Sequence, residues 1–190
     1  MNTQIMTTKL TLLTALLALG AAGPGAGAAA GAAEAPATLD KQLEPLRPFL
    51  GKTWKGLFKS STPDKPKYDV ARWERILNGR AVRIMHSVGN GEYGGETIVV
   101  WNKEAGQLQF HYFTTAGFTT RGTMTFEGTK VITTEKVTGS ESGISEVKAV
   151  AELLPDGRMH SKSRYFKNGE WVDGHELTYA EAPGAEVVFR

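Results

Sequence analysis

The chain has 190 residues, with 22 Lys and Arg against 20 Asp and Glu, and a formal net charge of +2. Its basic residues are scattered and do not form the stripe that nucleic-acid binding requires, so no nucleic-acid partner is expected. It has no cysteine, which excludes disulfides, thiolate metal sites, a cysteine nucleophile and a lipid-modified cysteine.

Residues 1–35 have the composition of a secretory signal followed by a small-residue linker. Lys9 is the only charge before Glu34, and an apolar run over 10–22 leads into Ala, Gly and Pro. This run is shorter than the about 20 residues that span a bilayer. We therefore expect a periplasmic or secreted protein with no integral membrane segment after signal removal. An uncleaved anchor and a disordered tail are the alternatives.

A short helix is predicted at the start of the folded domain. Apolar residues recur there at spacings of three and four: Leu39, Leu43, Leu46 and Leu50. Pro45 and Pro48 keep such a helix short, because proline has no amide hydrogen to donate. We expect the helix to plug one end of the fold, and Gly51 to release the chain into a first strand that begins at Trp54.

Short strand-like segments separated by turns fill the rest of the chain. Their residues are 54–58, 68–77, 81–88, 96–101, 108–112, 118–126, 130–137, 144–154, 159–166 and 175–180. The connections have hairpin length, and Asn78-Gly79 is the strongest short hairpin signal. They predict an all-β fold, a single up-and-down antiparallel meander over 39–182 closed into a β-barrel of about 8–10 strands. A β-sandwich is the alternative, and residues 183–190 form a tail.

Several positions resemble the lipocalin-like (calycin) barrels, and most of all bacterial exported lipocalin-like domains of unknown function. The matching residues are the opening Gly51 and Trp54, Trp73 before Asn78-Gly79, the loop through Gly94-Gly95, and the closing Trp171 with His175-Glu-Leu-Thr-Tyr179. The resemblance covers about residues 45–181. It implies a barrel of the kind that holds fatty acids, retinoids, haem or nothing identified, and it implies no catalytic residue.

The sequence contains no catalytic signature. The glycines over 89–94 match a dinucleotide-binding pattern, but that pattern needs a helix to follow, and 96–101 reads as a strand. The segment 175–179 begins like a zinc-protease helix, yet Tyr179 stands where the second histidine must be. No Gly-x-Ser-x-Gly segment is present.

No metal or other cofactor is expected from the four histidines. His86, His111, His160 and His175 lie on four different predicted strands, and no two of them have a local ligand spacing. A single inward histidine is enough to ligate haem, so haem is a possibility that the sequence does not support further.

A barrel of this size has room for one small ligand, although filling by its own side chains is the alternative. The candidate lining residues are Trp73, Arg83, His86, Phe110, Tyr112, Arg121 and Tyr165. An inward arginine would suit a carboxylate head group, because its guanidinium donates to both oxygens at once. Which face of each strand points inward is left open, because both faces carry apolar residues.

Three functions remain on this reading. The first is an exported protein that binds a small apolar or amphipathic molecule, fatty-acid-like or otherwise lipid-derived. The second is an isomerase, cyclase or hydrolase at the barrel mouth, with a carboxylate from Asp69, Glu74 or Glu96 and the imidazole of His86 or His111. The third is a ligand-free structural scaffold.

Overall fold

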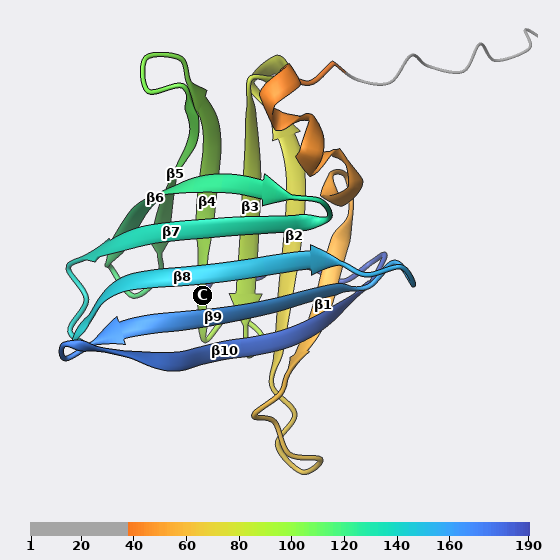
Figure 1. The fold of residues 1–190 in the computed structure, drawn as a ribbon. Coiled ribbons are helices and arrows are strands. Elements are labelled where there is room, and N and C mark those ends of the chain that lie inside the picture. The colour runs from red at the N-terminus through yellow and green to blue at the C-terminus, as the bar shows by residue number, and fades with distance from the viewer. Residues whose placement is uncertain (1–37) are drawn as a thin grey trace, which may run out of the picture. The chain divides into compact units, whose positions relative to one another are not determined.

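The computed structural model describes residues 38–190, and the predicted signal and linker of residues 1–35 lie outside them. In this range ten antiparallel strands form a closed barrel, each pairing with the next, and β1 pairs with β10 (Figure 1). They are β1 (Thr53–Phe58), β2 (Tyr68–Ile76), β3 (Ala81–Val88), β4 (Tyr93–Asn102), β5 (Gln107–Thr114), β6 (Thr119–Glu127), β7 (Lys130–Thr138), β8 (Ile144–Leu153), β9 (Met159–Lys167) and β10 (Glu170–Glu181). The predicted all-β meander barrel is confirmed.

A short 3₁₀-helix, η1 (Lys41–Phe49), precedes β1 and lies at one end of the barrel (Figure 1). A 3₁₀-helix has three residues per turn, so positions three apart share one face. Its three buried side chains have this spacing: Leu43, Leu46 and Phe49. The predicted short helix at the N-terminal side is therefore confirmed, and its two prolines are compatible with a helix this tight and brief.

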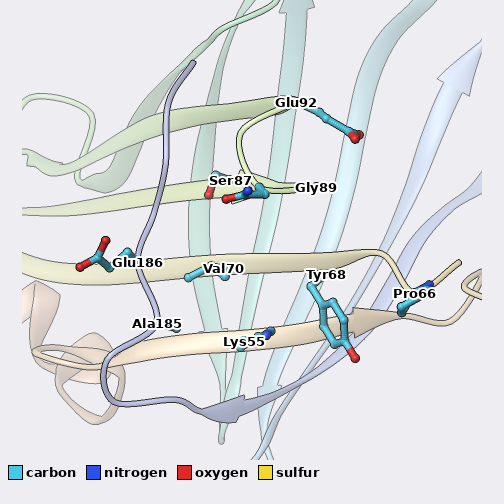
Figure 2. A pocket seen from close by; sticks show the side chains of 10 residues that line it. Lys55, Pro66, Tyr68, Val70, Ser87, Gly89, Glu92, Ala185 and Glu186 are labelled. Atoms are coloured by element: carbon cyan, nitrogen blue, oxygen red, sulfur yellow. The ribbon is translucent and has the colours of Figure 1, made fainter.

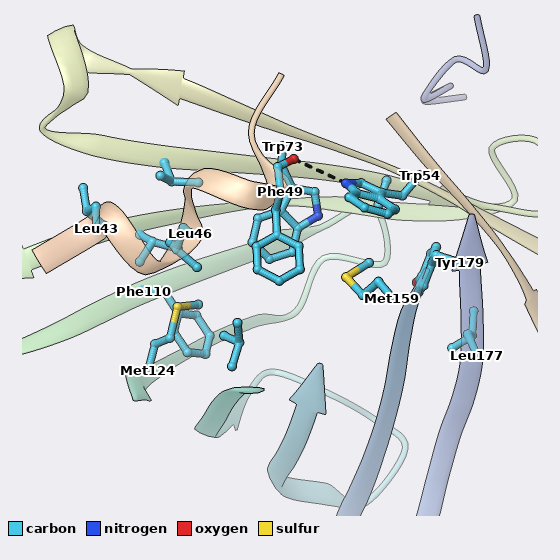
Figure 3. Packing of buried hydrophobic residues seen from close by; sticks show 14 of the residues in the cluster. Leu43, Leu46, Phe49, Trp54, Trp73, Phe110, Met124, Met159, Leu177 and Tyr179 are labelled. Atoms are coloured by element: carbon cyan, nitrogen blue, oxygen red, sulfur yellow. Dashed lines mark hydrogen bonds between the residues drawn. The ribbon is translucent and has the colours of Figure 1, made fainter. Parts of the chain in front are cut away.

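The helix joins the core through two tryptophans. The ring of Phe49 stacks on that of Trp73 with centroids 5.0 Å apart. Trp54 is fully buried, and its Nε1–H donates to the carbonyl oxygen of Phe49 at 3.3 Å (Figure 3). These contacts close the barrel end from which β1 starts.

Side chains alternate between the interior and the outer surface along each strand. On β3, Val82, Ile84, His86 and Val88 share the inner face. A second turn, η2 (Leu77–Gly79), links β2 to β3 where the Asn-Gly hairpin was expected, with positive φ at Asn78 and Gly79.

Two strands begin three or more residues before their predicted starts. β4 already begins at Tyr93, so the glycine-rich turn is shorter than the sequence suggested. β10 begins at Glu170 and continues through a bulge between Asp173 and Glu176, where the alternation is interrupted. A bulge hides the period of two on which strand prediction depends.

The C-terminal tail, residues 183–190, crosses the outer surface of the barrel without forming a strand. The backbone N–H of Val188 donates to Ser87 Oγ on β3 at 3.0 Å. A pocket of about 510 Å³ lies at the tail, and its lining includes Glu186 of the tail and Val70 of β2 (Figure 2). None of the helices formed by the described residues is long and apolar enough to cross a membrane.

Candidate ligand cavity

A cavity of about 760 Å³ occupies the barrel interior. Its lining reaches the loops that join β1 to β2 and β7 to β8, through Lys67, Ser140 and Ser142, at the end opposite η1. Most other lining side chains are apolar or aromatic, as is usual for small-molecule sites. The interior is therefore filled at the helix end only and holds space towards the other end.

Five of the seven predicted lining residues border this cavity: Trp73, His86, Phe110, Tyr112 and Tyr165. Arg83 and Arg121 do not, and this part of the prediction is corrected. On β3, Ile84 and His86 face inward, so Arg83 faces outward, where its Nε–H donates to Glu74 Oε2 at 3.1 Å. Arg121 is exposed, because its neighbour Thr120 on β6 points into the barrel.

The cavity wall carries a continuous line of hydrogen-bonded side chains, which we call the polar chain: Tyr179, Asp69, His86, Tyr112 and Tyr93. Tyr179 donates to Asp69 Oδ2 at 2.7 Å, and Asp69 Oδ1 lies 2.8 Å from His86 Nδ1. His86 Nε2 lies 2.7 Å from the Tyr112 hydroxyl, which lies 2.7 Å from the Tyr93 hydroxyl. Five strands contribute one residue each, so the chain joins side chains far apart in sequence.

Two glycines make room for the tyrosine rings of the polar chain. Gly95 lies opposite His86 in the β3–β4 register, and a Cβ atom there would lie 2.3 Å from the ring of Tyr112. Gly56 of β1 lies opposite both Asp69 and Tyr179, and a Cβ atom there would lie 2.7 Å from the Tyr179 ring. The missing side chains allow each ring to reach a polar partner across an intervening strand.

The phenols of the polar chain are held in their neutral form. Burial raises the pKa of Tyr112 and of Tyr179 far above the ordinary range, and it also raises the pKa of Tyr93. Asp69 is 3% exposed, and two hydrogen bonds satisfy its oxygens. The network therefore consists of neutral donors that converge on one buried carboxyl group.

A second polar group lines the cavity on β6 and β7. Burial raises the pKa of Glu135, and Thr120 donates a hydrogen bond to its Oε2. Sequence reasoning did not select Glu135, Tyr93, Tyr179 or His175 as lining residues. A signal for Glu135 was present: it alternates in phase with Val131 and Val137, both of which line the cavity.

The four histidines divide into two inner and two outer residues. His86 and His175 line the cavity, and His175 meets the ring edges of Phe58 and Tyr165 at centroid distances of 5.1 and 5.6 Å. His111 is exposed on β5, and the ring of His160 lies near Glu176 outside the cavity. Among residues 38–190 no group of three or more His, Asp and Glu side chains is placed to hold a metal ion.

The barrel has a structural counterpart among solved proteins. No family model matches the chain, and no curated protein matches it. The crystal structure of Rv2717c from M. tuberculosis is similar, with a TM-score of 0.57 and 11% sequence identity over 76% of this chain and 99% of that chain. The fold fits that of calycin-like barrels. At this identity the likeness concerns the fold alone.

The arrangement gives the barrel a largely apolar interior, in which the polar chain and the Glu135–Thr120 pair supply hydrogen-bonding groups. Both of the ring nitrogens of His86 take part in hydrogen bonds, so neither is free to ligate haem iron without breaking the polar chain. The haem possibility stays a prediction, for which His175 is the remaining cavity histidine in the described range.

Proposed function

We propose that this protein binds one small amphipathic, lipid-derived molecule inside the barrel. The observation that carries the proposal is the cavity of about 760 Å³, which has an apolar lining and one line of polar side chains. Cavities of known small-molecule sites measure about 300–1,000 Å³ and combine an apolar wall with a few placed polar groups. The apolar part of the ligand lies among residues such as Phe110, Met124 and Val147, and its head group lies at the polar chain.

The proposal is tested by filling the cavity. Ala149 and Val150 are neighbours on β8, but Ala149 lines the cavity and Val150 is exposed on the outer surface. Ala149→Phe should reduce ligand occupancy by about tenfold or more, because its ring takes the space of the ligand, whereas Val150→Phe should leave occupancy unchanged.

Native mass spectrometry of the full chain, beside its denatured mass, measures this occupancy. An added mass that disappears on denaturation, and that Ala149→Phe removes while Val150→Phe retains it, supports the proposal. A bare polypeptide mass for the wild type, even after incubation with a total lipid extract, contradicts it and favours the scaffold. An absorbance scan of the same sample detects haem if haem is the bound molecule.

Export of the protein and its membership in the exported lipocalin-like domains belong to the same proposal. Support comes from the charged, apolar and small-residue segments of residues 1–35, and from the residues that resemble those domains. A lipid-binding protein outside the cytoplasm would carry a poorly soluble molecule through an aqueous compartment.

A second candidate is an enzyme that uses Asp69 and His86, because this carboxylate–imidazole pair lines the cavity with 2.8 Å between Asp69 Oδ1 and His86 Nδ1. A proton taken from a substrate would reach His86 through the hydroxyls of Tyr93 and Tyr112, since Tyr112 lies at Nε2. The reaction would be an isomerisation, a cyclisation or a hydrolysis.

Turnover separates the two candidates. The molecule identified by mass spectrometry is incubated with the wild type and with His86→Gln, and the products are analysed. An enzyme converts it, and His86→Gln lowers the rate by about 100-fold or more while binding is retained. Recovery of the molecule unchanged from the wild type excludes it as a substrate.

A further inference from the structure

The polar chain has a direction, and this direction determines which head group the cavity accepts. Building on the proposed ligand binding, we propose that the cavity takes an amphiphile whose neutral head group donates a hydrogen bond, such as a hydroxyl. A carboxylate is accepted only together with one proton.

The direction of hydrogen-bond donation is set by Asp69. Its Oδ2 accepts the proton of Tyr179 at 2.7 Å, and an ionised carboxylate offers no donor, so His86 Nδ1–H donates to Oδ1 at 2.8 Å. A neutral imidazole with its proton on Nδ1 has a lone pair on Nε2. With the imidazole in this form, Nε2 accepts the hydroxyl proton of Tyr112 at 2.7 Å.

The hydroxyl protons of Tyr112 and Tyr93, at the other end of the polar chain, are assigned in the same way. Tyr112 has one hydroxyl proton, which it donates to His86, so its oxygen accepts the proton of Tyr93 at 2.7 Å. Tyr93 then has no further proton to donate. Tyr93 is one of the residues that line the cavity, so a ligand hydroxyl or amide N–H is the group that complements its oxygen as an acceptor.

The titratable groups around the cavity also offer little positive charge to an anion. Asp69 and Glu135 are carboxyls, and Lys67 in the loop before β2 is the single lysine or arginine side chain of the lining within residues 38–190. His175 on β10 has a lowered pKa because of its burial, which favours the uncharged ring. The remaining titratable lining groups besides His86 are phenols on four strands, Tyr93, Tyr112, Tyr165 and Tyr179.

A carboxylate bound at Tyr93 requires the donors and acceptors along the polar chain to exchange roles. The Tyr93 hydroxyl can donate to a ligand only if Tyr112 donates to Tyr93, and then His86 Nε2 must carry a proton. The alternative is that the acid enters protonated and donates to Tyr93 itself. In both cases one proton enters the site with the ligand, which a hydroxyl head group does not need.

The experiment compares decan-1-ol with decanoate, which have the same chain length, by isothermal titration calorimetry of the full-length protein at pH 8. Each titration is repeated in two buffers of different ionisation enthalpy, which counts the protons taken up on binding. We expect decan-1-ol to bind about tenfold more tightly and without proton uptake. Decanoate should bind with uptake of about one proton, and its affinity should rise as the pH falls.

Decanoate that binds as tightly as decan-1-ol with no proton uptake overturns this inference and leaves the proposed ligand binding intact. If neither decan-1-ol nor decanoate gives a heat of binding, the proposed ligand binding itself is overturned, and the inference with it. The two failures are therefore distinguishable in the wild-type protein alone.

The variant Asp69→Asn should reverse the direction of hydrogen-bond donation along the polar chain with little change of shape. The asparagine has nearly the shape of Asp69, and its carbonyl oxygen still accepts from Tyr179, but its amide donates to His86 Nδ1. His86 Nε2–H then donates to Tyr112, and Tyr93 donates into the cavity with no added proton. We expect this variant to bind decanoate without proton uptake and to lose its preference for decan-1-ol. A variant that merely loosened the fold would weaken both probes equally.

Discussion

At the scale of the single residue, Glu135 places a carboxyl group on the inner face of β7 between Val131 and Val137. Water is the better solvent for a charged carboxylate, so burial raises the pKa of this group above its ordinary value of 4.5. The neutral acid is the form that suits the cavity. Glu135 therefore links the stability of the barrel to pH.

Glu135→Gln should become relatively more stable than the wild type as pH rises. A carboxyl with a raised pKa holds its proton more tightly in the folded state than in the unfolded chain. Burial of Glu135 therefore costs the wild type least at a pH below 4.5, the ordinary pKa of the carboxyl. The free energy of unfolding then falls as the pH rises from there through the raised pKa of the folded state. Each tenfold difference in proton affinity corresponds to about 1.4 kcal/mol.

Urea unfolding of both proteins between pH 4 and pH 8 measures this difference. Glu127→Gln is the control, because Glu127 is exposed at the end of β6. A constant stability difference between Glu135→Gln and the wild type over this pH range would contradict a raised pKa of the buried Glu135.

At the scale of the element, the helix η1 and the start of β1 form a closed end that depends on two tryptophans with different surroundings. Trp54 is fully buried and donates from Nε1 to the carbonyl oxygen of Phe49. Trp73 is also buried, but its Nε1 has no hydrogen-bond partner in the described structure. An unpaired buried donor carries a cost that its removal relieves.

Trp54→Phe should therefore destabilise the barrel more than Trp73→Phe, by about 1–2 kcal/mol in the free energy of unfolding. Both substitutions remove the same atoms, so the loss of ring volume is matched, and the hydrogen bond to Phe49 is the main difference. Chemical denaturation of the two variants gives the comparison. Equal losses of stability would show that this hydrogen bond does not secure η1 to β1.

At the scale of the whole molecule, closure of the barrel adds Tyr179 to the polar chain. Tyr179 on β10 and Asp69 on β2 are 110 residues apart, and both strands flank β1. The register of β1 with both neighbours places Gly56 between the two side chains. An open sheet with the same strands would leave them at its two ends, so the bond that joins Tyr179 to the rest of the polar chain depends on closure.

Export of the whole molecule is predicted from residues 1–35, which lie outside the described residues. If they direct export, bacterial expression of the full chain should yield a periplasmic protein whose N-terminus lies between residues 28 and 36. Cell fractionation and the intact mass of the purified protein measure this. Recovery of the uncleaved chain in the cytoplasm would contradict export.

The local pattern of the sequence was enough to predict the fold. Turn pairs such as Asn78-Gly79 and the alternation along β3 indicate strands, because both depend on residues close in the chain. Bulges and glycine-rich turns interrupted this pattern, which is why the starts of β4 and β10 were misplaced.

The inner face and the site were decided by the tertiary structure. Which of two alternating faces points inward depends on the partners of a strand, so Arg83 and Arg121 were expected inside and lie outside. Tyr179 reaches Asp69 because closure and Gly56 bring its ring there, and Tyr112 reaches His86 across β4 because Gly95 leaves room for its ring. Contacts over such sequence distances follow from the register of the closed barrel, and no local pattern records them.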